Sequence, residues 1–382
     1  MQAATETPPD PAEAQTPATP EPAIKPLTWA LAIATYKRHD VLMQCVELAL
    51  QQTRPPAEVI IADASPDWET GRDQLLGRFR EAHPHVRFVY EQARRPSAAV
   101  QRNQVAQLAE SDILFLIDDD SLMHPGCAAD VLDIYELDPD QRVAGVSLLE
   151  TPVDPRESPI EPGQPAPACV SPQAQSSAAK PHHPLVRRLR RLLDADNLFV
   201  PYDDDFPNHP IPPAITERKR VGNRQLIAGK TMTARRDYAL AEPFSELLDR
   251  AANGEDSDMS YRLSRHGCLL TALDAPLFHL GSPGGRMNLF QTAALGALNP
   301  LVHHRFHSTD LDRSRRANRS LLRRRRLIAL LKDLRARRWS LPEARGYHFA
   351  LRHLDRILDH DRQSLAQWYP GFQKQITESR HA

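Results

Sequence analysis

The sequence predicts an α/β protein in which a mostly parallel sheet carries helices on both faces and is followed by a C-terminal helical extension. Short apolar runs alternate with amphipathic segments between residues 27 and 117, as parallel strands alternate with crossover helices. One of these runs, Ile113–Ile117 (ILFLI), is apolar throughout, which is typical of a strand buried on both faces. The last third of the chain, by contrast, has helical patterning.

Each element can be placed on the chain. Strands are expected at Leu27–Ala34, Glu58–Ala62, Val86–Tyr90 and Ile113–Ile117. Helices are expected at 40–52, at 69–82, at 97–110 with Ser97 as the cap, at 288–300 and at 311–368. Because ligands of such a sheet bind beyond the carboxyl ends of its strands, the chemistry is expected at those ends.

Clusters of proline mark the expected domain boundaries. Residues 1–26 have the composition of a disordered tail, and residues 27–286 form the predicted α/β domain. That domain contains a Pro-rich insert at 150–220. Residues 287–382 form a basic helical region, in which the stretch 311–340 carries twelve Arg and Lys against two Asp.

Composition excludes several classes of protein. The 382 residues carry 48 Lys and Arg against 49 Asp and Glu, so a nucleic-acid-binding surface is not expected. No apolar run reaches the roughly 18 residues of a membrane-spanning helix, and the first residues do not resemble a secretory signal. Four separated cysteines suit a reducing compartment. We therefore expect a cytoplasmic protein, with peripheral contact at the inner membrane surface as an open alternative.

The triplet Asp118-Asp119-Asp120 directly follows the ILFLI strand. Three adjacent carboxylates repel one another, and a hard divalent cation relieves that repulsion. In an extended segment alternate side chains point the same way, so Asp118 and Asp120 can address one ion together. The alternative is an acidic turn that caps a helix beginning near Pro125.

A second acidic segment, GEDSDMSYR, begins at Gly254 and opens a helix expected to end at Gly267. A carboxylate here could take a proton from a hydroxyl nucleophile, although acidic residues at a helix start are also stabilised by the helix dipole. His279, in LFHLGSPGG after a strand-like run, is a plausible metal ligand or a structural histidine. Tyr36, Arg38 and Asp63, at two strand ends, suit a bound nucleotide.

In combination these segments resemble family 2 glycosyltransferases, which have the GT-A (Rossmann-like) fold and use nucleotide-diphospho-sugars. The resemblance covers about residues 27–149 and 221–286. It rests on the segments ATYKR, ADAS, RRPSAAVQRNQVAQLAESDILFLIDDD, GEDSDMSYR and FHLGSPGG. It implies a metal-dependent transfer with inversion, in a single displacement, to an acceptor hydroxyl.

The resemblance also implies residue roles. Thr35, Tyr36, Arg38 and Asp63 would hold the nucleobase and ribose, and Arg102 would help close the nucleotide pocket. Asp118 and Asp120 would bind Mn²⁺ or Mg²⁺ as the family's DxD motif, with Asp119 near the donor sugar and His279 as a further ligand. Asp256 would be the catalytic base, with Glu255 or Asp258 as alternatives.

The expected partners are the nucleotide-sugar donor, with UDP as the default, and a saccharide or lipid-linked acceptor, as in surface polysaccharide or glycolipid synthesis. The basic 311–340 stretch could contact an anionic membrane, or it is a solvated helix face. Two other hypotheses remain open. One is another metal-dependent nucleotide enzyme, either a nucleotidyltransferase or a phosphohydrolase. The other is a non-enzymatic module that binds membrane or polyanion through the basic helices.

Overall fold

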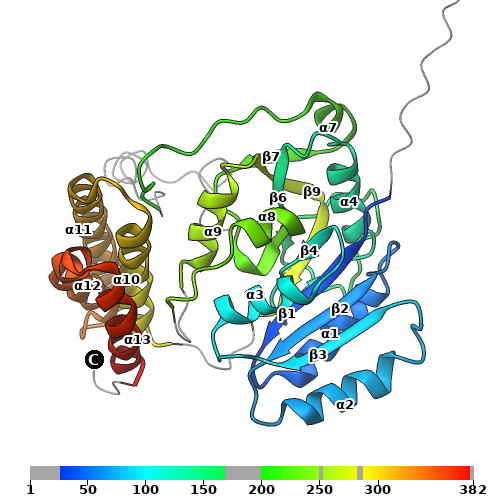
Figure 1. Cartoon of the computed structure of the whole chain (residues 1–382), viewed down its shortest axis with the longest axis horizontal. Helices are drawn as coiled ribbons and strands as arrows, with labels where there is room; N and C mark the ends of the chain where they lie inside the picture. Colours follow the sequence, from blue (N-terminus) through cyan, green and yellow to red (C-terminus); the bar gives the residue numbers. More distant parts are fainter. Residues whose placement is uncertain (1–25, 168–198, 249–252, 282–286, 379–382) are drawn as a thin grey trace, which may run out of the picture.

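A computed structural model describes residues 26–167, 199–248, 253–281 and 287–378. The expected tail lies almost wholly outside these residues, as do 168–198 of the expected insert and 282–286 of the LFHLGSPGG segment. The chain folds around a nine-stranded sheet in which the order of strands along the main path is β3-β2-β1-β4-β8-β6-β9-β5, with β7 paired to β9 (Figure 1).

The first half of the sheet is parallel and follows the predicted alternation. Its strands are β1 (Trp29–Thr35), β2 (Glu58–Asp63), β3 (Arg87–Gln92) and β4 (Ile113–Phe115). Its helices are α1 (His39–Leu50), α2 (Trp68–Phe79) and α3 (Ala98–Leu108). Ser97 is the N-cap of α3, as predicted, but its hydroxyl donates to the backbone oxygen of Leu248 (2.9 Å) and accepts no hydrogen bond from the helix start.

The second half of the sheet is mixed. It contains β5 (Ser121–Met123), β6 (Val143–Thr151), β7 (Val221–Arg224), β8 (Met232–Arg235) and β9 (Cys268–His279). The helices here are α4 (Cys127–Glu136), α7 (Pro213–Arg218), α8 (Arg236–Ala241) and α9 (Glu255–Leu263). Strand β8 runs antiparallel to both β4 and β6. Its first residue therefore lies at the edge where β1 and β4 end.

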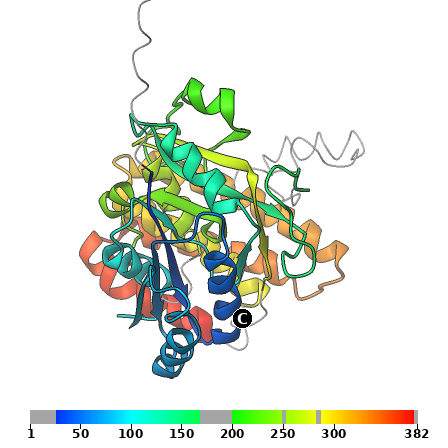
Figure 2. The ribbon, with the colours of Figure 1, turned by 90° about the vertical axis from the view of Figure 1, so that its right-hand side faces the viewer.

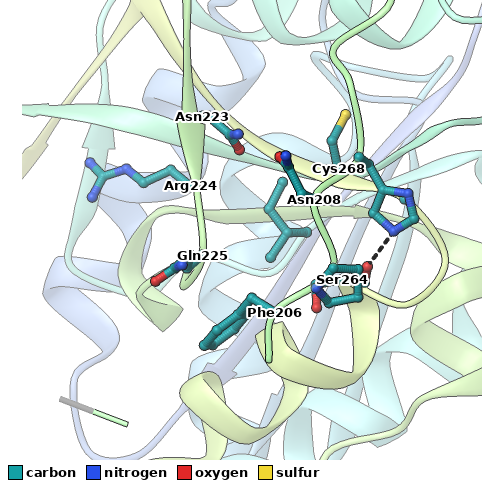
Figure 3. Close-up of a pocket in the computed structure, with 11 residues that line it drawn as sticks. Phe206, Asn208, Asn223, Arg224, Gln225, Ser264 and Cys268 are labelled. Carbon is teal, nitrogen blue, oxygen red and sulfur yellow. Dashed lines mark hydrogen bonds between the residues drawn. The ribbon is translucent and has the colours of Figure 1, made fainter. Parts of the chain in front are cut away.

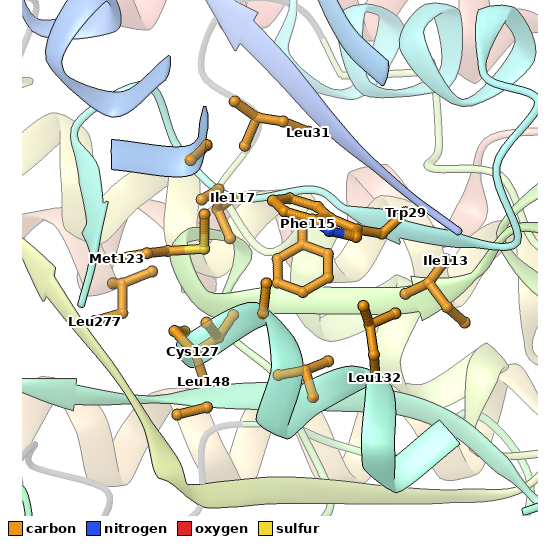
Figure 4. Close-up of a cluster of buried hydrophobic side chains, with 14 of the residues drawn as sticks. Trp29, Leu31, Ile113, Phe115, Ile117, Met123, Cys127, Leu132, Leu148 and Leu277 are labelled. Atoms are coloured by element: carbon orange, nitrogen blue, oxygen red, sulfur yellow. The ribbon is translucent and has the colours of Figure 1, made fainter. Parts of the chain in front are cut away.

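Two apolar layers cover the sheet. One contains side chains of α1, α2 and α4 packed against strand residues that include Trp29 and Phe115, whose ring centroids are 4.4 Å apart (Figure 4). The other contains side chains of α3, α8 and α9 against the opposite face. Because both faces are covered, the central strands β1 and β4 are almost wholly apolar, as the ILFLI run predicted.

Four helices follow the sheet and share a separate apolar core. They are α10 (Leu289–His307), α11 (Leu311–Arg335), α12 (Pro342–Asp359) and α13 (Arg362–Glu378). They form one end of the molecule in Figure 1 and lie behind the sheet in Figure 2. The α/β class, the helices on both faces and the C-terminal helical extension are thus confirmed. None of the helices in the described residues is long and apolar enough to cross a membrane.

Candidate functional site

The acidic triplet lies where β1, β2 and β4 end. Strand β5 begins immediately after it at Ser121, and helix α4 starts only at Cys127. The N-cap of α4 is Gly126, and in the first turn the Ala128 nitrogen donates to the Gln52 side chain (3.0 Å). The triplet is therefore not a helix cap, and the alternative explanation of its three carboxylates is excluded.

Asp118, Asp120 and His279 come together at this edge. Their ligand atoms all lie within 4.8 Å of one another, and Asp120 Oδ1 is 3.2 Å from His279 Nε2. The sheet causes this approach, because β5 and β9 are antiparallel and pair Ser121 with His279. Two carboxylates and an imidazole form a donor set that suits a divalent metal ion.

Asp119 has different neighbours from the residues on either side of it. Its Oδ2 accepts a hydrogen bond from Thr35 Oγ1 (2.7 Å), and its Oδ1 pairs with Arg38 Nη1 (3.1 Å). Burial raises the pKa of Asp119 to about 6, even though Thr35 and Arg38 favour its charged form. Asp119 thus connects the triplet to the loop after β1.

Arg102 joins the two acidic segments. Its guanidinium bonds Asp118 Oδ1 (2.7 Å) through Nη2 and Glu255 Oε1 (2.9 Å) through Nη1, and only 6% of its side chain is exposed. Gly229 makes room for it, because a Cβ there would stand 2.6 Å from Arg102 Nη2. Glu255, 153 positions after Arg102 in the sequence, therefore meets Asp118 at one buried cation.

The first turn of α9 carries Glu255 and Asp256. Burial and the nearby Asp256 raise the pKa of Glu255 to about 8, against the opposing effect of Arg102. Asp256 is partly exposed, and it accepts hydrogen bonds from the backbone nitrogens of Gly229 (3.2 Å) and Ser257 (2.7 Å). These bonds fix the Asp256 carboxylate without occupying all of its acceptor capacity.

Asp258 does not lie with these residues. It is fully buried, its Oδ1 accepts from the Tyr202 hydroxyl, and its Oδ2 pairs with Arg262 (2.8 Å). Its carboxylate is thus engaged by Tyr202 and by Arg262 of the same helix, and the geometry gives no support to Asp258 as an alternative base. Helix α9 also ends at Leu263, before Gly267, so Gly267 is not its C-cap.

The residues expected to hold the nucleotide differ in their exposure to solvent. Tyr36 is exposed, whereas Asp63 is fully buried and its oxygens accept bonds from Ser65 and Tyr90 and contact His39. The Asp63 carboxylate is thus engaged within the protein. A hollow of about 670 Å³ opens beside these positions between the loops after β1 and β2. Its lining is Lys37, Arg38, His39, Asp40, Val41, Pro66, Asp67, Thr70 and Gln74.

Sequence reasoning missed Lys37, Pro66 and Asp67 in this lining. The available signal was their position directly after the ends of two parallel strands. A second hollow, of about 350 Å³, lies far from the acidic residues (Figure 3). It is lined by Phe206, Asn208, Arg224 and Cys268 among others, at the amino end of β9, whereas His279 is at the carboxyl end.

Comparisons with known proteins were made for the sequence and for the fold. Residues 30–160 match the family model described as glycosyl transferase family 2. No curated protein sequence matches the chain.

Three solved structures illustrate the likeness in fold. GalNAc-T7 with UDP, GalNAc and Mn²⁺ has 16% identity and a TM-score of 0.45, over 73% of this chain and 47% of that one. The mannosyltransferase PcManGT from Pyrobaculum calidifontis, in complex with GDP-Man and Mn²⁺, has 15% identity and a TM-score of 0.45, over 95% and 88%. S. aureus TarS 1–349 has 12% identity and a TM-score of 0.45, over 91% of each chain.

This chain thus spans about half the length of the GalNAc-T7 chain. The family match covers β1 through β6 and the acidic triplet, whereas α9 with Glu255 and Asp256 and β9 with His279 lie beyond it. Residues 30–160 are thus similar to glycosyl transferase family 2, and the match holds for that part of the chain.

Proposed function

We propose that the chain moves a sugar from a nucleotide-diphospho-sugar, UDP-linked by default, to an acceptor hydroxyl with inversion and with the help of a divalent metal ion. The observation that carries this proposal is the meeting of two acidic sets at one edge of the sheet. The set Asp118, Asp120 and His279 has the composition of a metal site, and Arg102 ties it to the acids at the start of α9.

Asp118, Asp120 and His279 would hold the metal ion. Among Mn²⁺ and Mg²⁺ the imidazole favours Mn²⁺, because Mg²⁺ binds oxygen ligands and retains several waters. When bound, the ion would supply Lewis-acid stabilisation of the charge that develops on the departing diphosphate. The donor nucleotide is proposed to lie in the hollow after β1 and β2, which Arg38 links to the triplet.

Asp256 is the proposed general base. It would take the proton of the acceptor hydroxyl as the hydroxyl oxygen bonds to the anomeric carbon and the bond from that carbon to the nucleoside diphosphate breaks. Its partial exposure and its bond from the Gly229 nitrogen suit this task. Glu255 is proposed as a positioning residue, because its carboxyl contacts Arg102 and its pKa of about 8 keeps it largely protonated at neutral pH.

Ligand-induced stabilisation tests the donor and metal assignments. UDP with Mn²⁺ at about 100 times its Kd should stabilise the wild-type fold by about 2.7 kcal/mol, and UDP-sugars should do likewise. Asp120→Asn should lose the metal-dependent part of this shift. Asp73→Asn, an exposed change on α2, should keep it. Equal stabilisation of the wild type by UDP and UDP-sugars with and without Mn²⁺ would contradict the metal assignment.

The base assignment needs a separate measurement. Asp256→Asn should lower kcat for sugar transfer by about 100-fold or more while leaving the Mn²⁺-dependent stabilisation by UDP intact. A variant that retains wild-type kcat would exclude Asp256 as the base. Because the donor shift is recorded on the same protein, loss of folding is distinguished from loss of chemistry.

We also propose that α11 contacts an anionic membrane and brings the active site to a lipid-linked acceptor. Leu327, Leu331 and Leu334 recur at helical spacing and are exposed, and Trp339 beyond the helix is 75% exposed. Exposed arginines flank them at 323, 326, 335, 337 and 338. Apolar side chains for insertion beside cations for lipid headgroups are typical of a helix that lies in a membrane interface.

Sedimentation with lipid vesicles tests this contact. The full chain should bind vesicles of phosphatidylglycerol and phosphatidylcholine, and bind pure phosphatidylcholine weakly. Leu331→Ser should weaken binding, whereas Leu289→Ser, which changes a similarly exposed leucine at the start of α10, should not. Failure to bind anionic vesicles would refute the membrane contact and leave the donor chemistry unaffected.

A further inference from the structure

A second cluster of metal-binding side chains lies between α9 and α10, apart from the triplet. Asp258 Oδ1 on α9 is 3.6 Å from His303 Nδ1 and 3.5 Å from His307 Nε2, both on α10. The three ligand atoms all lie within 4.8 Å of one another. The two histidines are four residues apart on one helix, a spacing that places both rings on the same face.

His303 is an unusual buried residue. It is fully buried, and among the described residues neither of its ring nitrogens has a hydrogen-bond partner. A buried polar atom without a partner destabilises a fold, so such atoms are rare and indicate an ion or a water. Here Nδ1 faces the Asp258 carboxylate at 3.6 Å, a distance too long for a hydrogen bond.

The same distance fits a shared ion. A tetrahedral Zn²⁺ with ligand bonds of about 2.0–2.2 Å holds its ligand atoms about 3.3–3.6 Å apart. The separations of Asp258 Oδ1 from the two imidazole nitrogens, 3.6 and 3.5 Å, agree with this.

The protonation states also agree with metal binding. Burial lowers the pKa of both His303 and His307, which favours the neutral ring that coordinates metals. Burial would raise the pKa of Asp258, but the Arg262 cation at its Oδ2 (2.8 Å) opposes this and favours the charged carboxylate. Asp258 is therefore ionised at neutral pH.

Outer groups hold the Asp258 carboxylate in place. Tyr202 donates its hydroxyl hydrogen to Oδ1 and so leaves one lone pair of that oxygen for an ion, while Arg262 binds Oδ2 (2.8 Å). Arg262 also pairs with Glu242 (3.0 Å), which divides its charge between two carboxylates. Such outer partners orient the ligands of metal sites. His307 is 34% exposed, which gives an ion access from solvent.

We propose that Asp258, His303 and His307 form a second metal site, for a tetrahedral ion of the Zn²⁺ class, that fastens helix α10 to helix α9. The fourth position is open to a water molecule. The site is separate from the proposed Mn²⁺ site at the sheet edge, because it shares no residue with Asp118, Asp120 and His279. Its role is structural. The ion would join α9, which begins with Glu255 and Asp256, to α10, the first helix of the C-terminal extension.

Cobalt binding tests the site. Co²⁺ substitutes for Zn²⁺ and absorbs visible light when its coordination is tetrahedral. The full, tag-free chain carrying Asp120→Asn, which removes a ligand of the first site, should bind one equivalent of Co²⁺ with that absorption. Adding His307→Gln should weaken binding by more than the about 10–100-fold that loss of an outer-shell partner costs. Adding His85→Gln, a change of an exposed histidine elsewhere, should leave binding unchanged.

Zn²⁺ content measured after dialysis should follow the same order among the three proteins. The proposal is overturned if the Asp120→Asn chain binds no Co²⁺, or if the His307→Gln variant binds it as tightly as the His85→Gln control. A far-ultraviolet circular dichroism spectrum of the His307→Gln variant that matches its parent shows that the fold is retained. Because His307 is partly exposed, its replacement leaves the apolar core intact.

Discussion

The link between the two acidic segments can be tested by replacing Arg102 with methionine. Methionine keeps much of the aliphatic volume but removes the cation from Asp118 and Glu255. The Asp118 side chain is 36% exposed, so its lost pair counts for at most about 1 kcal/mol. Lost hydrogen bonds to the neutral form of Glu255 add a similar amount. We therefore expect Arg102→Met to destabilise the fold by about 1–2 kcal/mol near pH 6.5.

The destabilisation should grow with pH. The pKa of Glu255 is about 8 in the fold and 4.5 in the unfolded chain, so the folded state binds the extra proton between these values. The contribution of Glu255 to the wild-type free energy of unfolding accordingly falls as pH rises from about 4.5 to 8. Above pH 8 it levels off. Without Arg102 the folded pKa rises further, and the fall continues above pH 8 by about 1.4 kcal/mol per pH unit.

Equilibrium urea unfolding at pH 6.5 and pH 9 measures both the destabilisation by Arg102→Met and its increase with pH. The free energy lost in Arg102→Met should be about 1.4 kcal/mol larger at pH 9 than at pH 6.5. In a Glu255→Gln background the loss should be the same at both pH values, because no proton is exchanged at that position. The reasoning is refuted if the loss in Arg102→Met does not change with pH, or if the change persists in the Glu255→Gln background.

Two glycines give further predictions, both read out by thermal unfolding. Gly229→Ala should force the Arg102 guanidinium off its two carboxylates and cost about 1–3 kcal/mol, with weaker Mn²⁺ binding. Gly222→Ala is the matched control, because no atom lies within 4 Å of its added Cβ. Gly267→Ala should cost about 3 kcal/mol or more, since its Cβ would meet the Arg142 backbone oxygen at 2.1 Å. A Gly267→Ala chain that melts with the wild type would show that this contact relaxes freely.

Local patterns were sufficient to predict the edge of the sheet where the acids gather. Strand β2 extends only one residue beyond the expected Glu58–Ala62. The agreement is close because continuous apolar runs are typical of strands that are buried on both faces. Because the triplet follows the apolar run that ends at Ile117, it was predicted to lie at the same carboxyl edge of the sheet as Thr35 and Asp63. Strand β4 is shorter than its apolar run, ending at Phe115, because its partner β8 pairs only from Phe115 back to Ile113.

The partners of charged side chains could not be predicted in the same way. Glu255 and Asp258 are three residues apart, so helical spacing alone would assign them to one face. In the structure Arg102 contacts the first, whereas Tyr202 and Arg262 contact the second. Tyr202 lies 56 residues before Asp258, and Arg102 lies 153 residues before Glu255. No local pattern encodes pairings at such separations.

Helix α9 is held from two sides by groups that do not contact each other. Arg102 connects its first turn to Asp118. Asp258, one turn further along the helix, lies against His303 and His307 of α10. A helix of nine residues cannot bend appreciably between these points, so a displacement of α10 must also move Asp256. The C-terminal helices therefore contact the helix that carries the proposed base. A change that displaces α10 should accordingly lower kcat, and because Glu255 moves with Asp256 and contacts Arg102, it should also weaken the Mn²⁺-dependent stabilisation by UDP measured on the same variant.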